Sequence, residues 1–166
     1  GGGGVVQQAG LGRGIRDGVV KGDIGGTKGK PYVIELAARL SGGYFCTHEI
    51  PLNTGVNFVG QAIRLALGEK VDPSDLQPRF QRYVSQRYLF PSPGRVTRIQ
   101  GVSQVAECPG IELCEVRVNV GDMVKPIDSH PARAGVIIAT GDSREQAIER
   151  AQAAVRDILI ETVPLM

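Results

Sequence analysis

The sequence predicts an α+β protein in which antiparallel strands and helices form two successive parts. Three observations predict this class. Apolar and polar residues alternate over short segments that Gly-rich turns separate, which is typical of β-hairpins. A short apolar run at residues 135–139 is typical of a buried strand. An amphipathic helix begins after this run, at Ser143.

Composition and charge narrow the classes of function. Of the 166 residues, 42% are hydrophobic and 22% are charged, which is typical of a globular protein. The net charge is only +2 and aromatic residues make up 5%, so neither nucleic acid nor a membrane surface is an expected partner. The odd number and irregular spacing of the cysteines favour a reducing compartment, the cytoplasm. These cysteines are Cys46, Cys108 and Cys114.

The first elements are a lead-in and a hairpin. Residues 1–17 are rich in glycine and show little periodicity, so we expect a flexible lead-in. Residues 18–24 and 31–40 flank a Gly-rich turn and predict two paired strands. In the second strand the even-numbered positions, such as Ile34, are apolar and should face the core, whereas the odd-numbered positions should face away.

The polar face of this hairpin carries opposed acids. If the strands pair about Gly29, Asp23 lies directly opposite Glu35, and two facing carboxylates repel each other. A cation is therefore expected beside them. Two explanations stay open at this point. Lys21 and Arg39 could neutralise a solvated face, or the two acids could hold a divalent metal ion such as Mg²⁺, with Arg39 directed at an anion.

A helix and a domain boundary follow the hairpin. Asn53 or Thr54 can cap a helix over residues 55–67, whose expected apolar face includes Ile63. Gly68 is expected to end this helix. Turn-forming residues then place a domain boundary after residue 70.

The second part, residues 71–166, is expected to alternate strands with helices. A short helix is expected over residues 102–108, and a longer one follows Ser143, whose hydroxyl and the Gln146 side chain form a capping box. The expected strands are residues 80–90, 95–99, 112–120 and 135–139.

The hairpin resembles the metal-binding end of the ATP-grasp ligases. In that family an acid on one strand precedes, by about a dozen positions, a Glu-x-Asn-x-Arg sequence on the next strand. Asp23, Glu35 and Arg39 have this spacing, while Ala37 occupies the Asn position. Three further stretches are similar to the C-terminal domain of biotin carboxylases and related ATP-grasp ligases. They are residues 89–96, 121–129 and 140–147.

The resemblance implies a domain organisation. Residues 18–70 would be the C-terminal, metal-binding portion of an ATP-grasp domain, made of antiparallel strands plus a helix. Residues 71–166 would be a small biotin-carboxylase-like α+β domain. The N-terminal lobe of an ATP-grasp enzyme would then lie outside residues 1–166. The carboxylate–amine ligase branch is the better match, because Gly42 and Gly43 stand where biotin carboxylase has Val-Glu.

The resemblance also implies an activity. It implies a ligase that uses Mg-ATP to activate a small-molecule carboxylate as an acyl phosphate, which an amine then captures. Asp23 and Glu35 would hold Mg²⁺ or Mn²⁺, and Arg39 would be catalytic. The candidate ATP-binding residues are Lys21, Ser41, Gly42 and Gly43.

Two points stay open. Ala37 removes one oxygen ligand from the family pattern, so the number of metal ions is undecided. The alternative function is a non-catalytic partner-binding domain, or a subunit of a split ATP-grasp enzyme. In either case an apolar surface left uncovered by the missing lobe predicts a homodimer.

Overall fold

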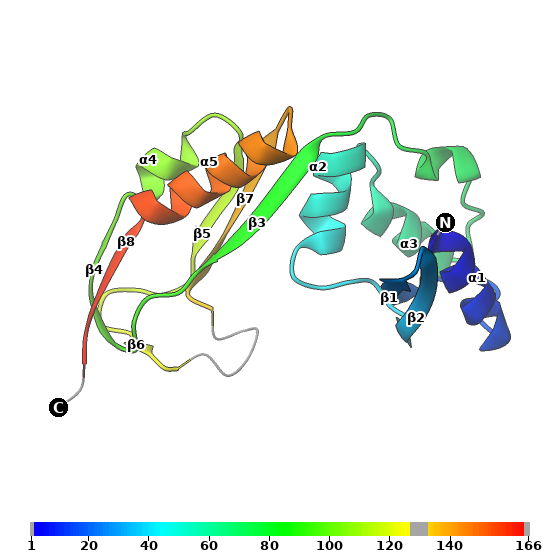
Figure 1. Ribbon diagram of the computed structural model, residues 1–166, viewed down its shortest axis with the longest axis horizontal. Helices are drawn as coiled ribbons and strands as arrows, with labels where there is room; N and C mark the ends of the chain where they lie inside the picture. The colour runs from blue at the N-terminus through cyan, green and yellow to red at the C-terminus, as the bar shows by residue number, and fades with distance from the viewer. Residues whose placement is uncertain (1, 127–132, 165–166) are drawn as a thin grey trace. The chain divides into compact units, whose positions relative to one another are not determined.

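The computed structural model describes residues 2–126 and 133–164. The chain divides into two compact units, Gly1–Phe80 and Gln81–Met166, and both combine helices with antiparallel strands (Figure 1). The α+β class is therefore confirmed. The division lies later in the chain than residue 70. Residues 71–80 stay with the first unit, where the Arg79 amide donates a hydrogen bond to the Thr54 carbonyl (2.8 Å).

The expectation that residues 1–17 form a flexible lead-in is wrong for most of this segment, which forms a helix. α1 (Gly2–Gly12) occupies most of the segment for which an irregular conformation is expected from glycine content. It packs on β1 (Lys21–Thr27) and β2 (Lys30–Ala37), the two strands of the hairpin. A methyl group on Gly22 would lie 2.6 Å from a Val6 methyl, so the helix sits directly on the strand. This tertiary contact overrides the low helix propensity of glycine.

The remainder of unit 1 is helical. η1 (Phe45–Glu49) is a single π-helical turn, and α2 (Ile50–Thr54), α3 (Phe58–Ala66) and the 3₁₀ helix η2 (Pro73–Leu76) follow it. The single helix expected over residues 55–67 is therefore too long at its N-terminus. The cap of α3 is Asn57, whose side chain accepts a hydrogen bond from the Gly60 amide (2.9 Å).

The C-terminal end of α3 agrees with the sequence, but its apolar face does not. Gly68 follows the helix with φ +81°, the left-handed conformation expected of a terminating glycine. Ile63 is 56% exposed, although it is expected to face the core. Phe58, Ala62 and Leu65 instead line the half-buried side of α3.

Unit 2 is built on two three-stranded antiparallel sheets. Their strand orders are β3–β7–β5 and β6–β4–β8. The strands are β3 (Tyr83–Leu89), β4 (Gly94–Gln100), β5 (Ile111–Val116), β6 (Met123–Val124), β7 (Gly135–Gly141) and β8 (Leu159–Val163). β6 and β8 were not expected from the sequence, because β6 is very short and β8 follows a helix directly.

The core of unit 2 lies where α5 (Arg144–Asp157) packs on β3 and β7, with α4 (Val102–Ala106) against β5 (Figure 1). Ser143 caps the N-terminus of α5 as predicted, whereas the Gln146 side chain bonds to the amide one residue before Ser143. The Ser143 hydroxyl accepts from the Gln146 amide (3.1 Å), and the Gln146 side chain accepts from the Asp142 amide (2.7 Å). Of the stretch 121–129 that resembles biotin carboxylases, residues 127–129 lie outside the described residues.

Candidate functional site

The hairpin is closed by a two-residue turn. Lys28 (φ 48°) and Gly29 (φ 76°) are both left-handed, and Thr27 pairs with Lys30 beside them. Two consecutive positive φ values are typical of the type I′ turn, whose twist matches that of the flanking strands. The turn is tighter than the six-residue loop that the run of glycines suggests, because β1 continues through Gly25 and Gly26.

A β-bulge aligns the two acids. The ladder pairs Ile24 with Val33 and then Asp23 with Glu35, leaving Ile34 as the extra residue of β2. A regular ladder from the turn would have placed Ile34, rather than Glu35, opposite Asp23. The bulge therefore turns Glu35 toward Asp23. It also leaves Ile34 66% exposed, so the expectation that Ile34 faces a core is wrong.

The predicted pairing of Asp23 with Glu35 is confirmed. The cation expected beside these acids is Lys21, whose Nζ donates to Asp23 Oδ2 at 2.6 Å. Side chains two residues apart in a strand share a face, so Lys21 and Asp23 lie on one side of β1. Gly22 faces α1 on the opposite side, whereas Glu35 lines a pocket with Ala9 and Gly12 of that helix.

These residues suit a hard divalent cation. Carboxylate oxygens are the ligands that Mg²⁺ prefers, and it commonly takes one or two carboxylates with water or phosphate oxygens completing its coordination. Asp23 and Glu35 supply such a pair. Within the described residues no group of three or more His, Cys, Asp or Glu side chains could hold a metal. Ala37, at the position of the family's Asn, lies directly opposite Lys21.

Arg39 lies beyond the end of β2. Its Nη1 donates to the Leu40 carbonyl at 3.1 Å, and its side chain is exposed. Arg39 is therefore close in sequence to the charged face. Strand pairing, in contrast, places Lys21, Asp23 and Glu35 near one another in space.

The loop after Arg39 has an unusual backbone. Gly43 (φ 66°) and Tyr44 (φ 70°) are both left-handed, and the π-helical turn η1 follows at once. The Ser41 amide donates to Cys46 Sγ at 3.3 Å, and the Phe45 amide donates to the Gly42 carbonyl at 3.3 Å. A left-handed tyrosine and a π-helical turn are both enriched at functional sites. The sequence signalled the glycines but not the conformation of Tyr44.

The π-helical turn carries a small polar group. The rings of Tyr44 and His48 meet edge to face with centroids 5.0 Å apart. Thr47 Oγ1 and His48 Nδ1 form a hydrogen bond of 2.9 Å. Burial raises the pKa of Glu49, the last residue of the turn, above its ordinary value.

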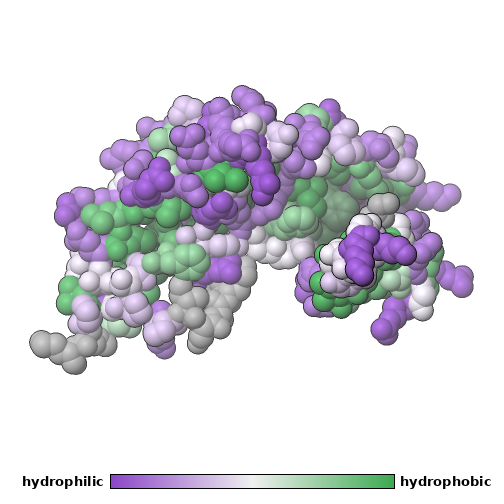
Figure 2. All heavy atoms as spheres, in the orientation of Figure 1, coloured by the Kyte–Doolittle hydropathy of each residue, from purple (hydrophilic) through white to green (hydrophobic). Residues whose placement is uncertain are grey.

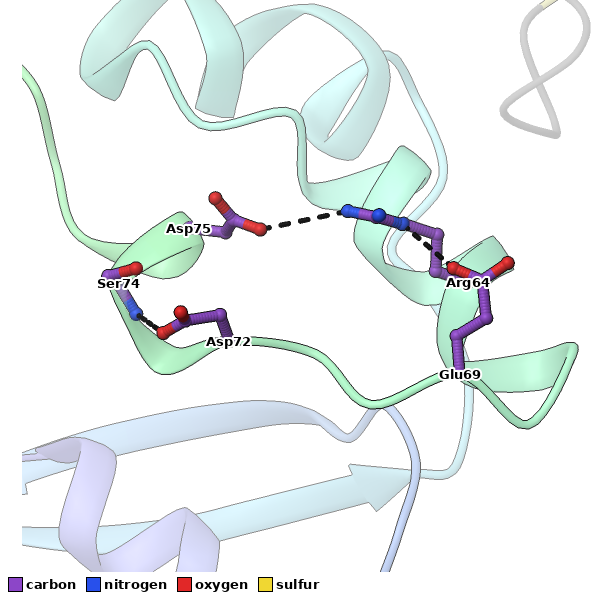
Figure 3. Close-up of polar contacts among 5 residues, drawn as sticks. All are labelled: Arg64, Glu69, Asp72, Ser74 and Asp75. Atoms are coloured by element: carbon purple, nitrogen blue, oxygen red, sulfur yellow. Dashed lines mark hydrogen bonds and ion pairs between the residues drawn. The ribbon is translucent and has the colours of Figure 1, made fainter.

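A second charged cluster in unit 1 has a structural role (Figure 3). Arg64 Nε lies 3.0 Å from Glu69 Oε2, and Arg64 Nη1 lies 3.7 Å from Asp75 Oδ2. Asp72 accepts a hydrogen bond from the Ser74 amide (2.8 Å), which lowers the pKa of Asp72. These side chains tie α3 to η2, and the acids are already paired with an arginine or an amide.

Known proteins resemble this chain in sequence and in fold. Residues 87–163 match the family model of the L-amino acid ligase C-terminal domain 2. An uncharacterized protein of Sinorhizobium fredii is 28% identical over 128 residues, which are 77% of this chain and 26% of that protein.

Solved structures extend the likeness to nearly the whole chain. Phosphoribosylglycinamide synthetase from Anaerococcus prevotii superposes with a TM-score of 0.81 at 16% identity, over 95% of this chain and 40% of that one. L-amino acid ligase from Bacillus licheniformis superposes with a TM-score of 0.76 at 22% identity, over 95% and 39%. Biotin carboxylase from Campylobacter jejuni gives 0.57 at 16%, over 82% and 30%.

These matches confirm the predicted resemblance. At such identities the structural likeness establishes the fold, and the family model covers the larger share of unit 2. The chain spans about 40% of the length of the phosphoribosylglycinamide synthetase and of the L-amino acid ligase. It has the fold of the C-terminal part of ATP-grasp ligases, with a second unit that matches the C-terminal domain 2 of L-amino acid ligases.

Proposed function

We propose that this chain is the C-terminal part of an ATP-dependent carboxylate–amine ligase. The observation that carries the proposal is the bulge-dependent pairing of Asp23 with Glu35, in a chain whose fold is that of ATP-grasp ligases. In the proposed reaction a carboxylate oxygen attacks the γ-phosphorus of ATP and ADP departs. The amine nitrogen then attacks the acyl carbon of the acyl phosphate, inorganic phosphate departs, and the amine loses a proton.

The residues of the hairpin have distinct parts in this proposal. Asp23 and Glu35 would hold Mg²⁺, which when bound neutralises charge on the phosphates. Arg39 would offset charge that develops on the transferred phosphoryl group, because its planar guanidinium can bind two oxygens at once. Lys21 and the loop of Ser41, Gly42 and Gly43 would contact the phosphates from the protein side.

The proposal requires a second lobe. The matched structures are more than twice as long as this chain, and a nucleotide site needs walls and donors on more than one side. The hairpin offers one charged face, on which Asp23 and Glu35 are exposed and Lys21 is half-buried. We therefore propose that an N-terminal ATP-grasp lobe completes the site, and that residues 1–166 alone have no measurable ligase or ATPase activity.

An alternative function is favoured by apolar exposure. Hydrophobic residues reach the surface among hydrophilic ones (Figure 2). In unit 1 the exposed large hydrophobic side chains include Leu11, Ile24, Tyr32 and Ile34. Such side chains associate with another surface, which fits a non-catalytic partner-binding subunit of a split enzyme or a homodimer.

In the described part of the chain, no helix has the length and hydrophobicity that a membrane crossing requires. The cysteine pattern supports a cytoplasmic location.

The activity is tested in the protein that joins this chain to such a lobe. Hydroxylamine traps acyl phosphates, so hydroxamate formation from amino acids should require both ATP and Mg²⁺. Arg39→Lys should lose most of this activity, since a point charge cannot replace the planar fork. Arg64→Lys, in the second charged cluster, is the matched control and should retain it. Wild-type turnover in Arg39→Lys would remove Arg39 from the mechanism.

A further inference from the structure

Lys21 occupies a special place on the charged face. The register sets it directly across the hairpin from Ala37, and its ammonium lies 2.6 Å from Asp23 Oδ2. The side chain of Lys21 is only 25% exposed, whereas that of Asp23 is 48% exposed. The small Ala37 offers no oxygen ligand at this point of the face. The Lys21 ammonium therefore lies across the hairpin from Ala37, a position that offers no side-chain oxygen to a metal ion.

The charges and ligands of this face suit one metal ion better than two. Asp23 and Glu35 carry two negative charges, and Lys21 already balances one of them. Each Mg²⁺ demands near-octahedral oxygen coordination, and two carboxylates with phosphate and water oxygens can meet that demand once. Within the described residues no third acid, histidine or cysteine joins the pair. A second divalent ion would also face repulsion from the Lys21 ammonium.

We infer that the hairpin site takes a single divalent cation, and that the Lys21 ammonium supplies the second positive charge to the polyphosphate. This inference rests on the proposed function and deepens it. Lys21 has two opposite effects in this arrangement. It weakens binding of the bare metal ion by repulsion and by occupying Asp23 Oδ2, and it strengthens binding of a polyphosphate by attraction.

The opposite effects give a test that needs no catalytic activity. Free Mn²⁺ is measured by electron paramagnetic resonance during titration of the 166-residue chain, and inorganic tripolyphosphate is then added as its Mn²⁺ complex. Lys21→Met should bind bare Mn²⁺ about 1.4- to fivefold more tightly, as expected for a partly exposed charge pair worth roughly 0.2–1 kcal/mol. The same variant should bind the tripolyphosphate complex more weakly by a similar factor, and Lys21→Arg should restore that binding.

The control is Lys30→Met. It removes the same charge from the same hairpin, but at the turn, where Lys30 pairs with Thr27. Asp23 and Thr27 are four residues apart, roughly 13 Å along an extended strand. Lys30→Met should therefore change neither titration. The wild-type chain should bind one Mn²⁺.

The outcomes separate this inference from the proposed function. Two Mn²⁺ ions per wild-type chain would overturn the single-cation inference, and so would a Lys21→Met variant that changes both titrations in the same direction or neither. Mn²⁺ binding that persists in both Asp23→Asn and Glu35→Gln would instead refute the metal site of the proposed function. Absence of any Mn²⁺ site in the wild type would overturn both.

Discussion

The strand β7 and the hairpin β1–β2 differ in how deeply their residues are buried. Every residue of β7 is buried, whereas no residue of β1 or β2 is. β7 is the central strand of its sheet, and α5 covers it, so its side chains contribute apolar burial. The hairpin instead displays paired charges on one face. The difference indicates that β7 contributes apolar burial to unit 2 and that the hairpin of unit 1 presents an exposed, charged surface.

The largest expected effect compares one isoleucine from each region. Ile138 in β7 is fully buried and Ile34 in the hairpin bulge is 66% exposed. Ile138→Ala should lower the free energy of unfolding of unit 2 by about 2–5 kcal/mol, because it leaves a cavity. Ile34→Ala should change that of unit 1 by less than about 0.5 kcal/mol.

Native-state hydrogen exchange measures each unit separately, which matters because a two-unit chain does not unfold in one step. Equal losses from the two substitutions would show that the hairpin is packed like a core, and would break the comparison.

Two glycines with similar backbones sharpen the comparison. Gly101 in unit 2 (φ +85°) and Gly29 in the hairpin turn (φ +76°) are both left-handed. An added methyl group would strike the Asp157 carbonyl at Gly101 but meets nothing at Gly29. Gly29→Ala should cost about 1–2 kcal/mol from backbone strain alone. Gly101→Ala should cost more, because a main-chain carbonyl must move. Denaturant midpoints followed by unit-specific exchange check this order, and a smaller cost at Gly101 would contradict it.

The smallest expected effect depends on pH. Burial raises the folded-state pKa of Glu49 above the ordinary carboxyl value of about 4.3. The penalty of burying its charge is absent below that pH and appears as the pH rises through the raised pKa. Glu49→Gln should therefore stabilise unit 1 near pH 7, by less than about 1 kcal/mol, and should have a smaller effect near pH 4. An equal effect at both values would mean that the Glu49 charge is not involved.

The hairpin shows which structural features could be predicted from the sequence and which could not. Pairing the two strands symmetrically about Gly29 predicts that Asp23 lies opposite Glu35, and this pairing is present in the structure. The tight turn at Lys28 would have broken this pairing, and the bulge at Ile34 restores it. Neither feature is visible in the pattern, because turn type and bulge position depend on which backbone the rest of the fold supports.

Elsewhere, features that depend on contacts between neighbouring residues were predicted correctly from the sequence. Features that depend on contacts between distant residues were not. The α5 cap at Ser143 and the α3 stop at Gly68 involve neighbours within one turn, and both were predicted. α1 depends on Val6 meeting Gly22, and β8 depends on pairing with β4, sixty or so residues earlier. The left-handed Tyr44 and its π-helical turn also had no sequence signal, since tyrosine disfavours that conformation.

In the proposed function, Asp23 and Glu35 bind Mg²⁺ together with ATP. Calorimetric titration of the 166-residue chain with ATP, with and without Mg²⁺, tests it most directly. The account predicts weak binding, on the order of millimolar, that requires Mg²⁺ and is lost in Asp23→Asn and in Glu35→Gln. Asp75→Asn, in the Arg64 cluster, should leave it intact. Micromolar ATP binding by a monomer, or binding that survives both substitutions, would contradict the account.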